Sequence, residues 1–229
     1  MNPPRYFGLI PAAGIGARLG VGIPKQYMPL AGKPMLAHVL DTFAAAVIAH
    51  TFVVVSAEDG YIHDLVAAAP HWSGRITILF RGGENRHASV LNGLQAIRAQ
   101  LGDDDWMLVH DAARPGLTGV LIENLIRVLQ NDDVGGLLAL PMVDTLKRSD
   151  QNGRVAQTVE RSALWAAQTP QMFRYGLLVQ ALTQATALTD EAGAIEMLGL
   201  QPRLIEGSPR NFKVTLPHDV ALAEMFLRS

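Results

Sequence analysis

The strongest constraint on the fold is a regular alternation of short apolar runs with helical patterns between residues 6 and 141. The apolar runs are continuous rather than alternating, which is typical of strands that have helices over both faces of their sheet. The expected strands are residues 6–10, 51–56, 75–80, 106–111 and 135–141. The expected helices are residues 35–46, 59–69, 86–101 and 119–131. This order predicts an α/β fold with a mostly parallel sheet, in which ligands bind at the carboxyl ends of the strands.

Residues 142–163 interrupt the alternation. They are polar, and an Asp-Gln-Asn-Gly turn at 150–153 separates two segments of roughly alternating polarity, which predicts a β-hairpin. Because a polar two-stranded ribbon is marginally stable alone, we expect an arm that projects and pairs with a second copy of the chain. A solvated hairpin on a monomer is the alternative. The remaining expected elements are helices at 177–186, 189–199 and 218–229, a strand at 202–207, and an edge segment on or beside which Lys213 lies.

Composition is that of one globular domain spanning residues 1–229, with the arm inside it. Hydrophobic residues make up 49% and charged residues 17% of the chain, which is enough for a sizeable core. The formal net charge of −2 provides no global basic field, so we expect no nucleic-acid partner. We expect neither a signal peptide nor a membrane span, because the apolar runs are too short. The absence of cysteine excludes disulfides and thiol chemistry and fits a cytoplasmic location.

A glycine-rich loop, PAAGIGARLGVGIPKQY at residues 11–27, follows the first expected strand. Glycines there let backbone N–H groups approach an anion closely. A dinucleotide-binding turn is disfavoured, because the third glycine of G-x-G-x-x-G is missing and the next strand does not end in an acidic residue. The G-x-x-x-x-G-K-[ST] phosphate loop is absent as well. Arg18 and Lys25 on this loop suit a triphosphate, and ordinary solvated charges are the alternative.

Asp111 and Arg114 belong to a second loop, VHDAARP at residues 109–115, which follows another expected strand. A parallel sheet would place this loop beside the glycine-rich one. A carboxylate there can contact Mg²⁺ directly or through its water, because Mg²⁺ keeps several waters and takes few protein ligands. Arg114 would then face a phosphate. The alternative is that Asp111 is the N-cap of the next helix.

The segment GGENRHASVLNG at residues 82–93 also follows an expected strand, so its glycine turn is a candidate for the same site as the two loops above. The segment has two interpretations. A nucleobase could lie against its glycine pair and be recognised by backbone groups, or Asn85 and Ser89 could simply cap a helix. Arg161 and Lys213 are lone cations that spacing alone would leave on the surface. The seven histidines show no paired spacing, so we expect no histidine metal site.

Together, these motifs resemble the 2-C-methyl-D-erythritol 4-phosphate cytidylyltransferases. The matching segments, in the family's order, are PAAGIGARLG…PKQY (11–27), GGENRHASV (82–90), VHDAARP (109–115), DTLKR (144–148), TVERSALW (158–165), TPQMF (169–173), LTDEAG (188–193) and NFKVTLPHDVALAE (211–224). The resemblance implies a Rossmann-like nucleotidyltransferase fold with a projecting β-arm that forms homodimers. It also implies Mg²⁺-dependent transfer of CMP from CTP to 2-C-methyl-D-erythritol 4-phosphate in the non-mevalonate isoprenoid pathway, giving 4-diphosphocytidyl-2-C-methyl-D-erythritol and pyrophosphate.

The same resemblance implies roles for individual residues. Arg18 and Lys25 would stabilise the α-phosphate, and Arg161 and Lys213 would position the attacking phosphate. The positions that would contact CTP are Ala12, Ala13, Gly14, Gly16, Gly82, Gly83, Ser89, Asp111 and Ala112. Those that would contact the acceptor are Asp111, Arg114, Thr145, Arg161, Thr169, Thr189 and Lys213, with Asp111 also near Mg²⁺. Thr145 and Arg161 lie on the arm, so in a dimer of the family's type they would serve the partner's active site.

Three features depart from the family's pattern. Ala88 stands where an acidic residue is usual, Gly193 stands where serine is frequent, and the segment 173–188 is a few residues short.

Three other functions stay open: a cytidylyltransferase for another polyol phosphate such as ribitol 5-phosphate, an NAD-dependent oxidoreductase, and a non-catalytic nucleotide-binding module. For phosphate as the attacking group no general base is needed, so catalysis would rest on positioning and charge neutralisation.

Overall fold

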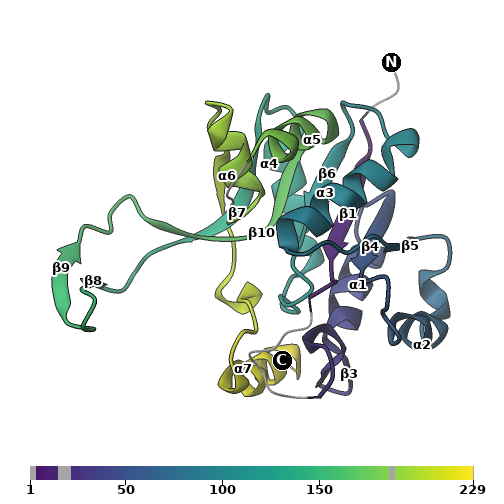
Figure 1. Cartoon of the computed structure of the whole chain (residues 1–229), viewed down its shortest axis with the longest axis horizontal. Coiled ribbons are helices and arrows are strands. Elements are labelled where there is room, and N and C mark those ends of the chain that lie inside the picture. Colours follow the sequence, from purple (N-terminus) through teal and green to yellow (C-terminus); the bar gives the residue numbers. More distant parts are fainter. Residues whose placement is uncertain (1–3, 15–21, 186–188, 229) are drawn as a thin grey trace.

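A seven-stranded sheet with the strand order β11-β7-β10-β6-β1-β4-β5 forms the centre of the computed structural model, which describes residues 4–14, 22–185 and 189–228 (Figure 1). Its strands are β1 (Tyr6–Pro11), β4 (His50–Val55), β5 (Ile76–Phe80), β6 (Trp106–Val109), β7 (Gly135–Pro141), β10 (Trp165–Arg174) and β11 (Arg203–Glu206). The helices of these residues are α1 (Met35–Ala45), α2 (Ile62–Ala67), α3 (Arg86–Ala96), α4 (Gly119–Leu129), α5 (Tyr175–Gln184), α6 (Glu191–Met197) and α7 (Pro217–Arg228).

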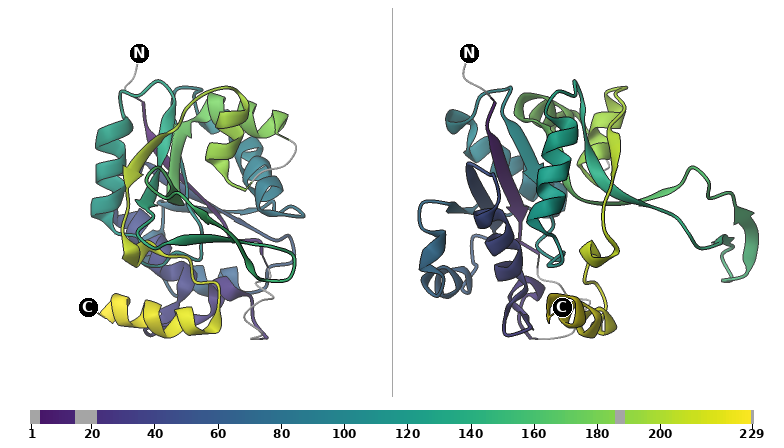
Figure 2. Two further views of the ribbon diagram at one scale, coloured as in Figure 1. Left: turned by 90° about the vertical axis from the view of Figure 1, so that its left-hand side faces the viewer. Right: turned by 180° about the vertical axis from the view of Figure 1, so that it is seen from behind.

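Successive residues of the central strands enter two different cores, one on each face of the sheet. On β1, Ile10 packs in the core that contains α1 and α4, whereas Leu9 packs in the core that contains α3, α5 and α6. On β6, Leu108 and Val109 divide between the two cores in the same way. Figure 2 shows the sheet between these helices. Burial on both faces explains why these strands are continuously apolar in the sequence, and it confirms the predicted α/β class.

Parallel pairing brings the carboxyl ends of neighbouring strands to one edge of the sheet. β1 pairs in parallel with both β4 and β6, and β4 pairs in parallel with β5. The sheet is therefore mostly parallel, as predicted. The loops that follow β1, β5 and β6 emerge at this common edge, which is where ligands bind in such sheets.

Strand β10 was not predicted, and it is the antiparallel member of the sheet. It pairs with β6 on one side and with β7 on the other. The sequence of β10 does not indicate a strand, because Pro170 and two glutamines are unusual inside a central strand. The register with β7 shifts between Ala167 and Gln171, and this irregularity accommodates the proline, which cannot donate a ladder hydrogen bond.

Several predicted boundaries also differ from the structure. α2 begins at Ile62 because the Asp59 carboxylate accepts hydrogen bonds from the N–H groups of Tyr61 and Ile62. α3 ends at Ala96 and is followed by a short 3₁₀ turn. Lys213 was expected on or beside an edge segment. It lies in a loop, which is held to the body by a hydrogen bond from the Val214 N–H to the Ala113 carbonyl.

Residues 142–164, between β7 and β10, form the projecting arm (Figures 1 and 2). Its hairpin consists of β8 (Leu146–Ser149) and β9 (Val155–Val159), which pair antiparallel around a turn at the predicted position. A smaller hairpin of β2 (Pro29–Leu30) and β3 (Lys33–Pro34) precedes α1. Among the helices described above, none is both long and apolar enough to cross a membrane.

Candidate active site

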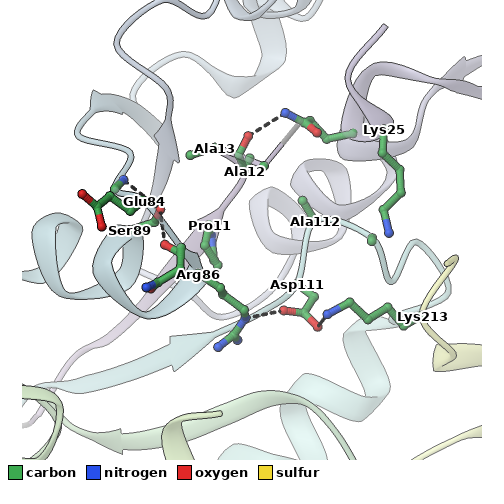
Figure 3. A pocket seen from close by; sticks show the side chains of 15 residues that line it. Pro11, Ala12, Ala13, Lys25, Glu84, Arg86, Ser89, Asp111, Ala112 and Lys213 are labelled. Carbon is green, nitrogen blue, oxygen red and sulfur yellow. Dashed lines mark hydrogen bonds and ion pairs between the residues drawn. The ribbon is translucent and has the colours of Figure 1, made fainter. Parts of the chain in front are cut away.

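A pocket of about 520 Å³ lies at the carboxyl ends of β1 and β6. Figure 3 shows its wall, to which the segment after β1, the start of α3 and the segment after β6 contribute. Lys25, from the far end of the loop that follows β1, and Lys213, from a loop distant in sequence, complete the wall. The structure therefore brings together the three strand-end loops, as the parallel sheet predicted.

A smaller pocket of about 240 Å³ shares part of this wall. Its lining includes Thr169 on β10 and Thr189 and Asp190 just before α6. Three charged residues line both pockets: Arg86, Asp111 and Lys213. The protein thus has two adjoining pockets whose shared wall consists of one carboxylate and two cations.

The Asp111 carboxylate is the centre of this shared wall. One of its oxygens lies 2.8 Å from Arg86 Nε, and the other lies 2.9 Å from Lys213 Nζ and 3.5 Å from Arg114 Nε. Arg86 and Lys213 reach it from opposite sides (Figure 3). Burial alone would raise the pKa of Asp111, but the surrounding cations hold it well below its ordinary value. The alternative role as a helix N-cap is wrong, because Thr118 caps α4.

Arg86 is a site residue that sequence reasoning missed, together with its partner Glu191. The Arg86 guanidinium donates to both Glu191 oxygens, at 2.6 and 2.9 Å, while its Nε contacts Asp111. Burial alone would lower the pKa of Arg86, but the two carboxylates raise it, so the guanidinium stays charged. Both residues lie within quoted motifs, GGENRHASV and LTDEAG. Each nevertheless looks like a surface charge at a helix start until the fold pairs them.

Glu191 is held in place by a polar cluster at the start of α6. Asp190 caps the helix by accepting from the Gly193 N–H at 3.0 Å, and its other oxygen accepts from the Gln171 amide at 2.9 Å. The side-chain amide oxygen of Gln171, Oε1, in turn accepts from the Ala192 main-chain N–H at 2.7 Å. The glycine that departs from the family's pattern at 193 supplies only its main-chain N–H, so this cap does not need a serine there.

Lys25 projects toward the shared wall from a short 3₁₀ helix, η2 (Lys25–Tyr27) (Figure 3). Its ammonium group donates to the Val214 carbonyl, in the same loop as Lys213. The next residue, Gln26, is buried and donates to the Ala12 carbonyl, which ties η2 to the end of β1. Gly14 lines the larger pocket, and Gly16 and Arg18 lie outside the described residues.

Gly82 and Gly83 are required by close packing inside the protein. A Cβ on Gly82 would lie 2.6 Å from the Ala13 Cβ, and a Cβ on Gly83 would lie 2.5 Å from the Ala88 Cβ. Their N–H groups donate to the Val55 carbonyl and the Ser89 hydroxyl. Asn85 caps α3 by accepting from the Ala88 N–H, which confirms the helix-capping interpretation for Asn85, whereas Ser89 lies inside the helix and does not cap it. The segment also lines the larger pocket through Gly83 and Ser89, together with Ala12, Ala13 and Ala112 from the two neighbouring loops.

Of the predicted acceptor residues, Asp111 and Lys213 belong to the shared wall, and the other five fall into two groups. Arg114, Thr169 and Thr189 line the smaller pocket, where the Arg114 guanidinium also donates to the carbonyls of Asn211 and Ala167. Thr145 and Arg161 are exposed on the arm and line neither pocket. The Arg161 guanidinium donates to the Val143 carbonyl at the base of the arm.

A metal held by protein side chains alone does not fit the described part of the chain. It contains no group of three or more His, Asp or Glu side chains arranged for a metal ion. Asp111 is a single carboxylate beside cations suited to phosphate. That donor set fits a Mg²⁺ ion that takes its other ligands from phosphate oxygens and water.

The two adjoining pockets meet at a charged wall, and both lie at the carboxyl edge of a mostly parallel sheet. This arrangement, together with the likeness to solved structures, defines the chain as a Rossmann-like α/β protein of the nucleotidyltransferase class. The chain belongs to the 2-C-methyl-D-erythritol 4-phosphate cytidylyltransferase family (IspD), whose model matches residues 7–229. This finding confirms the family resemblance of the sequence motifs.

Relatives of that name are similar over nearly their whole length. The protein from Cupriavidus pinatubonensis is 52% identical over 237 residues, covering 97% of this chain and 94% of its own. The protein from Azoarcus sp. is 52% identical over 229 residues, covering 99% and 95%. A crystal structure of a 4-diphosphocytidyl-2C-methyl-D-erythritol synthase matches with a TM-score of 0.86, 40% identity and 98% of both chains. The crystal structure of the cytidylyltransferase from Thermus thermophilus matches with a TM-score of 0.80 and 29% identity, covering 98% and 100%.

The Arg86–Glu191 pair yields a stability prediction. Glu191→Gln keeps the side chain's size but removes the charge that faces a largely buried guanidinium. We expect the free energy of unfolding to fall by about 2 kcal/mol or more, since breaking a buried pair leaves the guanidinium charge only partly compensated, by Asp111. Urea denaturation measures the loss. The control is Glu196→Gln, an exposed position on the same helix, which should change stability by less than about 0.5 kcal/mol. Equal losses in the two variants would contradict the assignment.

Proposed function

We propose that the protein transfers CMP from CTP to 2-C-methyl-D-erythritol 4-phosphate, releasing pyrophosphate, as a step of non-mevalonate isoprenoid synthesis. The observation that carries the proposal is the wall shared by the two pockets. Joining two phosphates requires two neighbouring anion sites, and cations where the sites meet must offset the repulsion between the ligands. Arg86 and Lys213 lie in that position.

In this proposal the larger pocket takes CTP. Lys25 faces the shared wall, where the α-phosphate would lie, and Arg18 would act with it. The cytosine would lie near Gly83 and Ser89. Of the glycine pair, only Gly83 lines this pocket, and because its N–H donates to Ser89, its carbonyl oxygen is the backbone group that it can offer to the base. A carbonyl oxygen accepts from the amino group of cytosine but finds no matching donor at that position on uracil, which favours CTP over UTP.

The smaller pocket takes the acceptor, whose phosphate would lie near Lys213. An oxygen of that phosphate attacks the α-phosphorus of CTP, a new P–O bond forms, and the bond to the bridging oxygen of pyrophosphate breaks. The attacking oxygen is already anionic, so no side chain needs to remove a proton. Lys25 and Lys213 offset the charges brought together, and Asp111 keeps Lys213 aimed at the shared wall. Mg²⁺ bound near Asp111 would neutralise further phosphate charge.

We further propose that the enzyme is a homodimer joined through its arms. The arm exposes the apolar side chains of Val143 and Val155, and Trp165 is exposed where the arm meets β10; a second copy of the chain could cover all three. Thr145 and Arg161 would then reach the acceptor pocket of that second copy. The proposal includes a cytoplasmic location, because the enzyme needs a supply of CTP.

A pyrophosphate-release assay tests the function. The panel pairs CTP or UTP with 2-C-methyl-D-erythritol 4-phosphate or ribitol 5-phosphate, each with and without Mg²⁺. We expect substantial release only with CTP, the methylerythritol phosphate and Mg²⁺. Release with ribitol phosphate but not with methylerythritol phosphate would instead identify a different polyol-phosphate cytidylyltransferase. Nucleotide binding without release for any acceptor would overturn the enzymatic assignment.

Replacement of Lys25 separates catalysis from binding. Lys25→Ala should lower kcat by about 10²-fold, because one preorganised charge at the reacting phosphate is lost. Steady-state kinetics measure the effect. The control is Lys33→Ala, which removes a lysine that pairs with Asp41 and lines neither pocket. An increase in KM for CTP with kcat unchanged would show that Lys25 binds ground state and transition state equally.

Mixed dimers test the arm. Arg161→Ala and Lys25→Ala would each be inactive alone, but a heterodimer of the two contains one site with an intact body and an intact arm. Mixing equal amounts should restore about a quarter of wild-type activity, because random exchange in a two-fold symmetric dimer makes half of the dimers mixed. A mixture of Lys25→Ala and Lys213→Ala, both in the body, should restore none. Confirmed subunit exchange without restored activity in the first mixture would exclude the shared site.

A further inference from the structure

His110 immediately precedes Asp111 and is a fully buried polar residue that the proposed reaction does not use. Its ring packs against Phe43, with the ring centroids 5.7 Å apart. Nδ1 lies 2.9 Å from the Thr169 hydroxyl oxygen, and Nε2 lies 3.2 Å from the Arg114 carbonyl oxygen. The Asp111 main-chain N–H donates to the same Thr169 oxygen at 3.1 Å. These contacts form one chain of hydrogen bonds behind the shared wall.

The partners of the two ring nitrogens determine where the protons lie. A carbonyl oxygen only accepts hydrogen bonds, so Nε2 must carry the ring proton that reaches Arg114. Both ring nitrogens have neutral partners, a carbonyl and a hydroxyl, so the buried ring is itself neutral and carries a single N–H. Nδ1 must then accept, and the proton it accepts is that of the Thr169 hydroxyl.

This arrangement leaves Thr169 without a proton for a ligand. A threonine hydroxyl has one proton and two lone pairs. The proton goes to His110, and one lone pair accepts from Asp111. An ionised phosphate accepts hydrogen bonds and cannot donate them, so Thr169 cannot bind the acceptor phosphate in this state, although it lines the smaller pocket.

The geometry points to a structural role at the site: we propose that His110 and Thr169 are a positioning pair that fixes the Asp111–Arg114 turn, and that Thr169 donates its hydroxyl proton to His110 rather than to the acceptor phosphate. The His110 ring spans this turn. It reaches Arg114 directly and Asp111 through Thr169, while the Arg114 N–H donates to the Asp111 carbonyl at 3.1 Å within the turn. The placement of the Asp111 side chain between Arg86 and Lys213 thus depends on a buried ring. The part concerning the acceptor rests on the proposed function.

Nuclear magnetic resonance of the wild-type protein tests the proton positions without any assay of activity. Long-range ¹⁵N–¹H correlation of the histidine rings distinguishes the protonated nitrogen, and loss of one ring signal set in His110→Asn identifies His110. We expect the proton on Nε2. A proton on Nδ1, or on both nitrogens, would leave the Thr169 hydroxyl able to donate to phosphate and would overturn the proposal.

Kinetics of matched variants test the positioning role. Thr169→Val removes the hydroxyl at constant shape, and His110→Gln retains an amide for Arg114 but removes the acceptor at the Nδ1 position. Each should lower kcat about tenfold with little change in the KM for 2-C-methyl-D-erythritol 4-phosphate, since a buried hydrogen bond that aligns the site is lost. His110→Asn, whose side-chain oxygen can replace Nδ1, should lose less than His110→Gln.

The double variant distinguishes a pair from two independent residues. Because both changes break the same chain of hydrogen bonds, Thr169→Val combined with His110→Gln should be no slower than the slower single variant. A rise in the acceptor KM in Thr169→Val, with His110→Gln unaffected, would instead show that Thr169 contacts the acceptor directly. If the variants do not fold, through-space contacts between the His110 and Phe43 rings assign the His110 signals, and the ring proton positions in the wild-type protein still decide the proposal. An inactive wild-type protein would refute the proposed function without altering that spectrum.

Discussion

The Asp111 carboxylate, in contact with Arg86, Lys213 and Arg114, is the interaction on which the site depends. Cations that must receive two phosphates repel one another when no ligand is bound. Asp111 offsets that repulsion on one side, and Glu191 offsets it for Arg86 on the other. Because the carboxylates hold the cations in place beforehand, little reorganisation is needed when phosphates arrive, which is the condition for strong electrostatic stabilisation of a reacting phosphate.

The fold determines which elements meet at Asp111. Parallel pairing of β1 with β6 places the loops after both strands at the same edge. The antiparallel β10 enters between β6 and β7 and brings Thr169 to the main chain of Asp111. The same strand leads out of the arm, so the element that fixes Asp111 also connects the site to the projecting hairpin.

Much of this architecture could be predicted from the sequence, because strands that are buried on both faces are visible as continuous apolar runs and their order indicates parallel pairing. The glycine-rich loop with Lys25, the turn with Asp111 and the turn with Gly82 and Gly83 were predicted to converge for that reason. The pairing of Arg86 with Glu191 could not be predicted from the sequence, since the two residues are 105 positions apart and neither belongs to a recognisable ligand spacing. β10 was hidden by Pro170 and its glutamines, whose polar groups are satisfied by long-range contacts such as those of Gln171 with Asp190 and Ala192.

The balance of charges around the smaller pocket of one chain suggests what an arm from a second chain would contribute. Arg86, Arg114 and Lys213 line the smaller pocket together with the carboxylates of Asp111 and Asp190, and Glu191 pairs with Arg86 behind the wall. Three cations are therefore offset by three carboxylates. This balance keeps the cations in place, but it leaves little net positive charge to attract a second phosphate. An additional cation that is not paired with a carboxylate would supply this missing positive charge. In the proposed dimer, Arg161 on the arm of a second copy provides that cation, so the preorganised wall and the added charge come from different chains.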